Sequence, residues 1–249
     1  MDKTTTDRLL ALNRAFYTAF ARPFAASRPV SDPALVCILP YIPRCASVLD
    51  VGCGNGRLAH LLDRERPGAT YVGVDVVPEL IEVARTQAER LTAIPAEFHV
   101  ADITAPGWAR LHGLVVGRSS FVFNTAVALA VLHHIPGFAL RLHVLHEIAG
   151  LLEPGGCLIL STWQFLGSPR MRRKIVDWTE LGIAEAALEP GDYLLDWKRE
   201  GRGLRYCHLV DRAEVERLAS GSGFRLRETF RAGGREGDLS LFAVLDSVA

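Results

Sequence analysis

Short apolar runs alternate with amphipathic stretches along most of the chain, and this pattern predicts a parallel sheet flanked by helices. Between the runs, apolar residues recur at helical spacing, as Leu58, Leu61 and Leu62 do after the first. Strands buried on both faces are nearly continuous in apolar residues. Five runs have this character: 48–51, 70–75, 97–100, 121–132 and 157–163. Such alternation is typical of an α/β protein with helices on both faces of the sheet.

The segments on either side of this alternation differ from it. Residues 1–45 predict a helical cap: a helix that Thr6 or Asp7 can cap and Pro23 should end, then a second apolar segment at 34–42. Residues 46–163 predict the sheet core, with an irregular loop at 104–118. Residues 164–207 have poor periodicity and predict an insertion after the fifth strand. Residues 208–249 add a helix and two strands around a glycine-rich loop, for seven strands in a single domain.

Composition limits the classes of function. Twenty-eight basic residues balance twenty-eight acidic ones, so no global field draws the chain to nucleic acid or membrane, and RNA binding would need a local basic face. The longest apolar run, 125–132, is too short to span a bilayer, and the charged N-terminus is not a signal peptide. The five cysteines have neither disulfide nor metal-ligand spacing. We therefore expect a cytoplasmic protein without a metal site.

The first strand leads into a turn with three alternate glycines, Gly52, Gly54 and Gly56, and the next helix follows. Glycines are needed where the backbone takes a positive φ or a ligand lies against the main chain. Asp75 ends the second strand, 19 residues after Gly56, where α/β nucleoside sites have a carboxylate that accepts from ribose hydroxyls. The alternative is a turn that only joins strand to helix, with Asp75 as a helix cap.

Two motifs resemble those of class I S-adenosylmethionine-dependent methyltransferases: Asp-x-Gly-x-Gly-x-Gly at 50–56 and Leu-x-Pro-Gly-Gly at 152–156. The resemblance implies a Rossmann-like fold, with S-adenosylmethionine as cofactor and Asp102 at its adenine. It makes Leu-His-His-Ile at 132–135 mostly architectural, and neither histidine has triad or zinc-ligand spacing. The cofactor contacts that it implies are Tyr17, Asp50, Gly52, Cys53, Gly54, Gly56, Asp75, Val76, Asp102, Ile103, Leu129 and Ala130.

Other segments resemble the tRNA wobble-uridine methyltransferases, which methylate the carboxylate of 5-carboxymethyluridine. They are Phe16-Tyr17, Phe24 and Ser27-Arg28 near the N-terminus, Trp163 at the end of the fifth strand, and Gly191-Asp192, Trp197 and the 205–209 segment in and after the insertion. The chain departs from that family at three places. Asp196 replaces a proline, Val30 and Ser31 replace a Pro-Trp pair, and Arg57 replaces a lysine.

This resemblance implies an acceptor that is already ionised. A carboxylate needs no general base, but it needs a fork-shaped donor such as arginine to hold it while it attacks the methyl group. Aromatic rings would stack on a splayed-out base. We expect catalytic roles for Arg28, Trp163, Arg205 and His208, with His208 as an orienting donor. We expect substrate contacts from Gln164, Arg172, Arg173, Trp197 and Tyr206.

The resemblance implies the tRNA anticodon loop as a partner, and eukaryotic relatives also use a small zinc-binding activator subunit. A basic run at 170–174 fits RNA phosphates, although it also fits an ordinary solvated helix face. Two alternatives remain. One is a methyltransferase that acts on a small carboxylic acid or other metabolite. The other is a non-catalytic protein that binds the cofactor or a partner.

Overall fold

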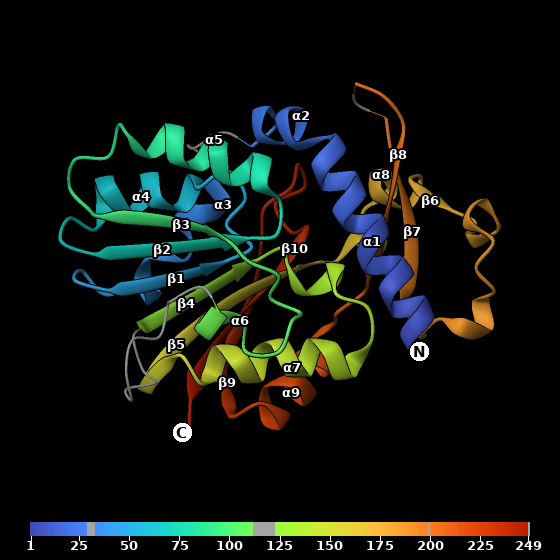
Figure 1. The fold of residues 1–249 in the computed structure, drawn as a ribbon. Coiled ribbons are helices and arrows are strands. Elements are labelled where there is room, and N and C mark those ends of the chain that lie inside the picture. Colours follow the sequence, from blue (N-terminus) through green and yellow to red (C-terminus); the bar gives the residue numbers. More distant parts are fainter. Residues whose placement is uncertain (29–32, 112–122, 199, 249) are drawn as a thin grey trace.

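The computed structural model describes residues 1–28, 33–111, 123–198 and 200–248. Its main sheet has the order β3-β2-β1-β4-β5-β10-β9 (Figure 1). The first five strands in that order are parallel, and β10 runs antiparallel to both β5 and β9. The strands are β1 (Ser47–Val51), β2 (Thr70–Asp75), β3 (Ala96–Val100), β4 (Phe123–Leu129), β5 (Leu152–Trp163), β9 (Phe224–Ala232) and β10 (Ser240–Ser247). The predicted seven-stranded, mostly parallel sheet is confirmed.

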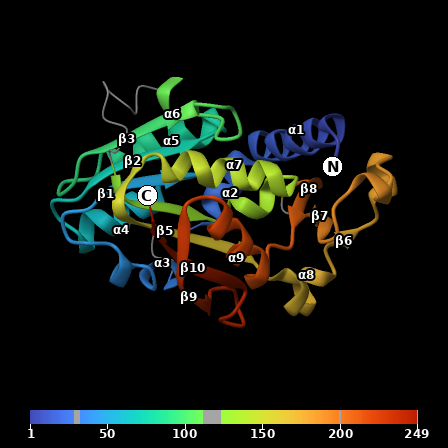
Figure 2. The same ribbon diagram turned by 90° about the horizontal axis from the view of Figure 1, so that it is seen from below.

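Helices cover both faces of this sheet, and each face has its own apolar core. Because side chains alternate along a strand, Val48 of β1 packs into one core and its neighbour Leu49 into the other. On one face lie α3 (Pro33–Val36), α4 (Arg57–Glu65) and α5 (Pro78–Ala88). On the other, which Figure 2 views from below, lie α6 (Trp108–Leu111), α7 (Phe138–Ala149) and α9 (Arg212–Gly221).

The insertion forms a second sheet that periodicity did not predict. Its strands β6 (Ile175–Val176), β7 (Asp192–Trp197) and β8 (Gly203–His208) are antiparallel. Helix α1 (Lys3–Ala19) packs on β8, beside the carboxyl end of the main sheet (Figure 1). Short helices complete the structure: α2 (Ala21–Ala26), α8 (Pro169–Arg172), η1 (Leu39–Tyr41), η2 (Leu132–His134), η3 (Phe165–Gly167), η4 (Trp178–Leu181) and η5 (Glu185–Ala187).

Several predicted boundaries were wrong. Asp2, not Thr6 or Asp7, caps α1, because its carboxylate accepts from the Thr5 N–H. Pro23 lies in the first turn of α2, where a missing N–H costs nothing. The turn expected at 153–156 belongs to β5, whose pairing with β4 shifts register there. The loop expected at 104–118 contains α6. Its remainder from 112, the start of the predicted fourth strand at 121–122, and the departures at Val30 and Ser31 lie outside the described residues.

No helix among the residues that the structure describes combines the length and apolarity needed to cross a membrane.

Candidate active site

The glycine turn between β1 and α4 gives each glycine a different reason to lack a side chain. All three have positive φ angles, 72° at Gly52, 56° at Gly54 and 73° at Gly56. A Cβ on Gly52 would lie 2.5 Å from Val131, and one on Gly56 would lie 2.8 Å from Phe98. These two glycines are therefore required by protein packing. A Cβ on Gly54 would meet nothing closer than 4.0 Å, so the middle of the turn faces open space.

Three carboxylates surround this turn. Asp75, at the end of β2, accepts from the N–H groups of Gly54 and Val77 at 2.9 and 3.0 Å. Asp50 is 4% exposed and accepts from the Tyr71 hydroxyl at 2.6 Å, and burial raises its pKa to about 7. Asp102 follows β3 and pairs with Arg14 of α1 at 2.5 Å. The carboxyl ends of three adjacent strands thus present acids to one cleft.

The cleft between α1, α2 and the carboxyl ends of β1, β2 and β4 has a volume of about 190 Å³. Eleven of the twelve predicted cofactor residues line it, and the exception is Gly56, at the start of α4. The open position at Gly54 and the neighbouring Asp75 carboxylate fit a nucleoside cofactor. Sequence reasoning missed Asn13, Arg14 and His134 in this wall. The first two lie one helical turn before Tyr17, and this spacing on α1 could have indicated them.

A larger groove of about 580 Å³ adjoins the cleft and shares Arg28, Ala130 and Trp163 with it. Its walls come from the N-terminal segment, the insertion, and the hairpin between β9 and β10. Asp196 is the single acid among the described residues that line it. Eight basic side chains line it: Arg28, Arg57, Arg170, Arg173, Lys174, Lys198, Arg205 and Arg235. The groove therefore carries an excess of positive charge.

Arg205 of β8 lies at the inner end of this groove, and its side chain is enclosed by aromatic rings. The centroids of Trp163, Phe16 and Trp197 lie 4.6, 5.2 and 5.5 Å from its guanidinium carbon. The residue is 2% exposed, and its Nε has no hydrogen-bond partner. Among the described residues, no carboxylate forms an ion pair with it. A buried cation of this kind is favourable only if another group compensates its charge.

A tyrosine–histidine pair separates Arg205 from the cofactor cleft. The His134 Nδ1 lies 3.1 Å from the Tyr206 carbonyl oxygen, so it carries the proton. Its Nε2 therefore accepts from the Tyr17 hydroxyl at 2.7 Å, and Arg205 Nη1 lies 3.4 Å from that hydroxyl oxygen. Burial, followed by the charge of Arg205, lowers the pKa of His134 to about 3. Burial also raises the pKa of Tyr17. At neutral pH His134 is therefore uncharged and weakly basic, and Tyr17 keeps its proton.

A family comparison identifies the chain. Residues 24–229 match the model of a family described as a methyltransferase domain. The chain belongs to this family and is a class I S-adenosylmethionine-dependent methyltransferase. S-adenosylmethionine is accordingly its cofactor.

Solved structures share the fold of this methyltransferase. A SAM-dependent methyltransferase from Methanosarcina mazei is 22% identical, with a TM-score of 0.65, over 85% of this chain and 97% of its own. The 1,6-didemethyltoxoflavin-N1-methyltransferase of Burkholderia thailandensis, solved with S-adenosylhomocysteine, is 17% identical, with a TM-score of 0.63, over 100% and 92%.

The names of two similar enzymes refer to different methyl acceptors. The tRNA (carboxymethyluridine(34)-5-O)-methyltransferase of Arabidopsis thaliana is 26% identical over 147 residues, which are 59% of this chain and 31% of that protein. A ubiquinone biosynthesis O-methyltransferase of Xylella fastidiosa is 33% identical over 117 residues, 47% of this chain and 42% of that protein. The methyltransferase therefore spans less than half the length of these relatives.

The structure brings some predicted acceptor residues together and leaves others out. Arg28, Trp163, Trp197, Arg173 and Arg205 line the groove. The other four predicted residues, Gln164, Arg172, Tyr206 and His208, line neither the groove nor the cleft.

The four residues outside the groove contact other parts of the protein. Gln164 donates to the Val210 carbonyl, and Arg172 donates to the Leu166 carbonyl. Tyr206 has no exposed surface, so the predicted stacking on a base is wrong. His208 is 3% exposed and bonded to two carboxylates, so it is not a donor in the groove. Tyr206 and His208 follow Arg205 by one and three residues in β8, so alternation along the strand turns both side chains to the face opposite Arg205.

Proposed function

We propose that this methyltransferase transfers a methyl group to a carboxylate on a modified nucleotide, a carboxymethyl-type wobble uridine of tRNA. The observation that carries the proposal is Arg205, a buried guanidinium in a basic groove that has no counter-ion within the part of the chain that the structure describes. An acceptor carboxylate would supply the missing negative charge. Arginine suits this task because its donors match both oxygens of a carboxylate.

The groups near Arg205 support an acceptor that needs no base. Burial lowers the pKa of His133 and His134, and the charge of Arg205 lowers them further. Neutral histidines with such weak basicity do not deprotonate a hydroxyl or an amine efficiently. A carboxylate is already ionised at neutral pH. Its oxygen forms a bond to the cofactor's methyl carbon as the carbon–sulfur bond breaks, and no proton moves.

The groove supports a nucleotide rather than an isolated acid. Its basic side chains extend from Arg205 to Arg170, Arg173 and Arg235, which suits the phosphates next to a splayed-out base. Trp197 of β7 lies in the same groove, half-buried, and provides a ring for stacking. The relative from Arabidopsis, whose name includes a carboxymethyluridine acceptor, also favours this class of substrate.

The proposal is tested with a synthetic anticodon stem-loop RNA that carries 5-carboxymethyluridine at the wobble position. The protein is incubated with this RNA and S-adenosylmethionine, and the nucleosides are analysed by mass spectrometry. We expect a gain of one methyl group as an ester, which mild alkali removes. The same RNA with an unmodified uridine is the matched control. A methyl group found equally on both RNAs would contradict the carboxylate acceptor.

Methylation of a small carboxylic acid or other metabolite is the second candidate. The balanced net charge of the chain and its similarity to the Xylella O-methyltransferase favour it. In that case the protein would convert small acids to methyl esters and would not bind the stem-loop. If the protein neither binds nor methylates the stem-loop but converts small acids to methyl esters, the second candidate is favoured over the first.

A further inference from the structure

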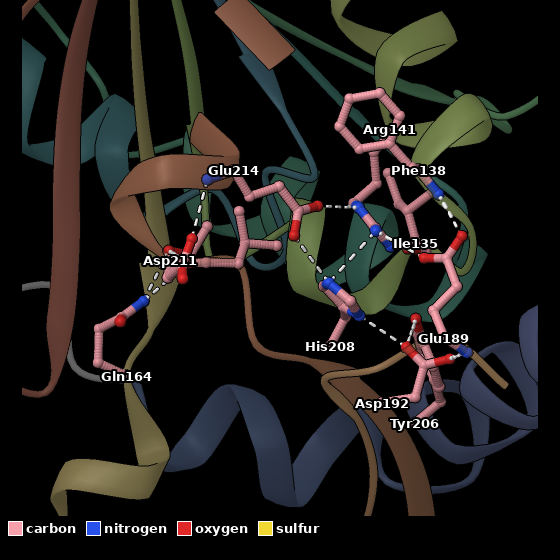
Figure 3. Close-up of polar contacts among 12 residues, drawn as sticks. Ile135, Phe138, Arg141, Gln164, Glu189, Asp192, Tyr206, His208, Asp211 and Glu214 are labelled. Carbon is pink, nitrogen blue, oxygen red and sulfur yellow. Dashed lines mark hydrogen bonds and ion pairs between the residues drawn. The ribbon is translucent and has the colours of Figure 1, made fainter. Parts of the chain in front are cut away.

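A buried network of charges lies behind the acceptor groove, at the junction of the insertion with the core. Figure 3 shows His208 at its centre, between the carboxylates of Asp192 and Glu214. The side chains of Arg141 and Glu189 complete it, and only Glu189 is more than slightly exposed. Such a network is costly to bury unless every charge has a partner. Its presence therefore needs an explanation.

The distances indicate two ring protons on His208. Its Nδ1 lies 2.6 Å from Asp192 Oδ1, and its Nε2 lies 2.9 Å from Glu214 Oε2. Ionised carboxylate oxygens only accept, so a neutral imidazole would turn one nitrogen lone pair toward an oxygen lone pair. Arg141 Nη2 is also near Nε2, but at the longer distance of 3.3 Å. The shorter contact makes Nε2 a donor to Glu214.

The charge balance agrees with this protonation state. The groups that face His208 come from every element around it: Asp192 of β7, Tyr206 of β8, Glu214 of α9, Arg141 of α7, Glu189 before β7, and His133 of η2. With an imidazolium, two cations face three carboxylates and one negative charge is left over, whereas a neutral ring would leave Arg141 alone against three. Burial would lower the pKa of His208, but its hydrogen bonds to Asp192 and Glu214 raise it above the ordinary value.

Metal binding is a poorer interpretation of the same cluster. One ligand atom from each of Glu189, Asp192 and His208 lies within 4.8 Å of the others. However, Arg141 donates to Glu189 at 2.9 Å, and the Tyr206 hydroxyl donates to Asp192 at 2.7 Å. Protein donors thus already occupy the carboxylate oxygens that a metal ion would use.

The network fastens strand β8 to the core. Asp192 and His208 are directly opposite each other in the β7–β8 pair. Gly191, with a φ of 100°, brings the chain across the imidazole ring, where a Cβ would lie 3.1 Å from Cε1. Through Glu214 and Arg141, the ring then connects this strand pair to α9 and α7. We call this network of His208, Asp192, Glu214, Arg141 and Glu189 the His208 lock. It joins parts of the chain that are far apart in sequence.

Arg205 precedes His208 by three residues in β8 and has no ion pair of its own among the described residues. Ring contacts, one long contact from Nη1 to the Tyr17 hydroxyl and the backbone position of β8 hold its guanidinium. We propose that His208 is a positioning residue: as an imidazolium between Asp192 and Glu214, it fixes the strand that presents Arg205 to the acceptor. This inference rests on the proposed role of Arg205 in holding the acceptor carboxylate.

The lock depends on pH in a defined direction. A raised folded-state pKa means that the folded protein holds the proton more tightly than the unfolded chain does. The stabilisation is complete below the unfolded pKa of about 6.5 and is lost as pH rises through the folded-state pKa. Acceptor binding should therefore weaken on the alkaline side. Cofactor binding, which uses the turn at β1, should not change with it.

The first test is nitrogen NMR of protein with ¹⁵N-labelled histidine, without any substrate. We expect both nitrogens of His208 to be protonated at pH 7, and the buried His133 and His134 to be neutral. Glu214→Gln should move the midpoint of His208 to lower pH, because it removes one of the two carboxylates. His99 is only half-buried and lies 3.3 Å from Glu97, so His99→Gln is the matched control. A neutral His208 at pH 6.5 would overturn the proposal.

The second test compares acceptor and cofactor affinities of the parent, Glu214→Gln and His208→Gln. The probe is the 5-carboxymethyluridine stem-loop, bound in the presence of S-adenosylhomocysteine. We expect acceptor affinity to fall by about tenfold to a hundredfold, the scale of a small misplacement of a binding group. Affinity for S-adenosylhomocysteine should stay unchanged, and so should both affinities in His99→Gln. Parent-like acceptor binding in a folded His208→Gln protein, with the same pH profile, would refute the positioning role.

The two tests separate this inference from the proposed function. If the parent protein neither binds nor methylates the stem-loop, the proposed acceptor is wrong. The NMR titration and the pH dependence of thermal unfolding still test whether a protonated His208 stabilises the network. We then expect the melting temperature of the parent to fall between pH 6 and pH 9 by more than that of His208→Gln. An equal fall in both proteins would overturn the lock.

Discussion

The cofactor cleft and the acceptor groove share a wall, yet they differ in charge and in origin. Three aspartates at the carboxyl ends of adjacent strands line the cleft, together with three arginines, Arg14, Arg28 and Arg57. Among the described residues, the groove has eight basic side chains and one acid. A chain with no net charge thus concentrates positive charge in one part of its site. The carboxylates suit a cofactor that has ribose hydroxyls and an ammonium group, and the cations suit an anionic acceptor. Net charge alone is therefore a poor guide to the substrate.

The largest effect is expected in the groove, at Arg205. Arg205→Ala should lower the rate of methyl transfer by about a hundredfold, the scale for loss of one preorganised charge donor. Arg205→Lys keeps the charge but loses the fork, so it should recover only part of the rate. The rate is measured in single turnovers with the 5-carboxymethyluridine stem-loop. Arg212→Ala is the matched control, because Arg212 is exposed and pairs with Glu216 on α9. Equal rates for the two alanine variants would remove Arg205 from the site.

A smaller effect is expected in the cleft, at Asp75. Asp75→Ala should weaken S-adenosylhomocysteine binding by about 1–3 kcal/mol, the cost of a lost hydrogen bond to a charged group. Calorimetry measures this, with Asp7→Ala as control, since Asp7 is exposed and pairs with Lys3. Because the cleft and the groove bind different molecules in this account, Asp75→Ala should change acceptor affinity little. Unchanged cofactor affinity would exclude the predicted ribose contact.

The smallest effect is expected at the outer part of the groove. Arg170 and Arg173 line it, whereas Arg172 lies between them in sequence, outside the groove. If the first two contact phosphates, each alanine variant should flatten the salt dependence of stem-loop binding by about 0.7 in logarithmic slope. Arg172→Ala should leave the slope unchanged. Equal slopes for all three variants would make the cluster an ordinary solvated face.

The two regions also differ in how far the sequence predicted them. In the cleft, the strand, turn and helix that carry each residue are adjacent in sequence, so Asp50, Gly54 and Asp75 could be placed from local motifs. Strand β2 has the bounds that its pattern predicted. The family match confirms the predicted class of enzyme and its cofactor. The division into cap, core, insertion and C-terminal segment stays a prediction, as do the roles of individual residues.

The insertion could not be predicted in the same way. Strand β7 is buried at four of its six positions without alternation, so it lacks the period of two that indicates a strand. Strand β8 buries Arg205 and His208, although arginine is mostly exposed in proteins and histidine is intermediate. The burial of His208 depends on Arg141, and that of Arg205 on the rings of Phe16 and Trp163, which lie far away in the sequence. These residues are visible in the sequence, but the contacts that make their burial possible could not be predicted from it.

The central claim is that the acceptor is ionised before it binds and that no base assists the transfer. It is tested most directly by single-turnover methyl transfer to the 5-carboxymethyluridine stem-loop between pH 6 and pH 8. A carboxyl group with an ordinary pKa of about 4 is ionised throughout this range, so the rate should not rise with pH. Loss of the His208 lock would only weaken acceptor binding at the alkaline end. A steep rise in rate with pH, with Arg205→Ala still active, would contradict the account.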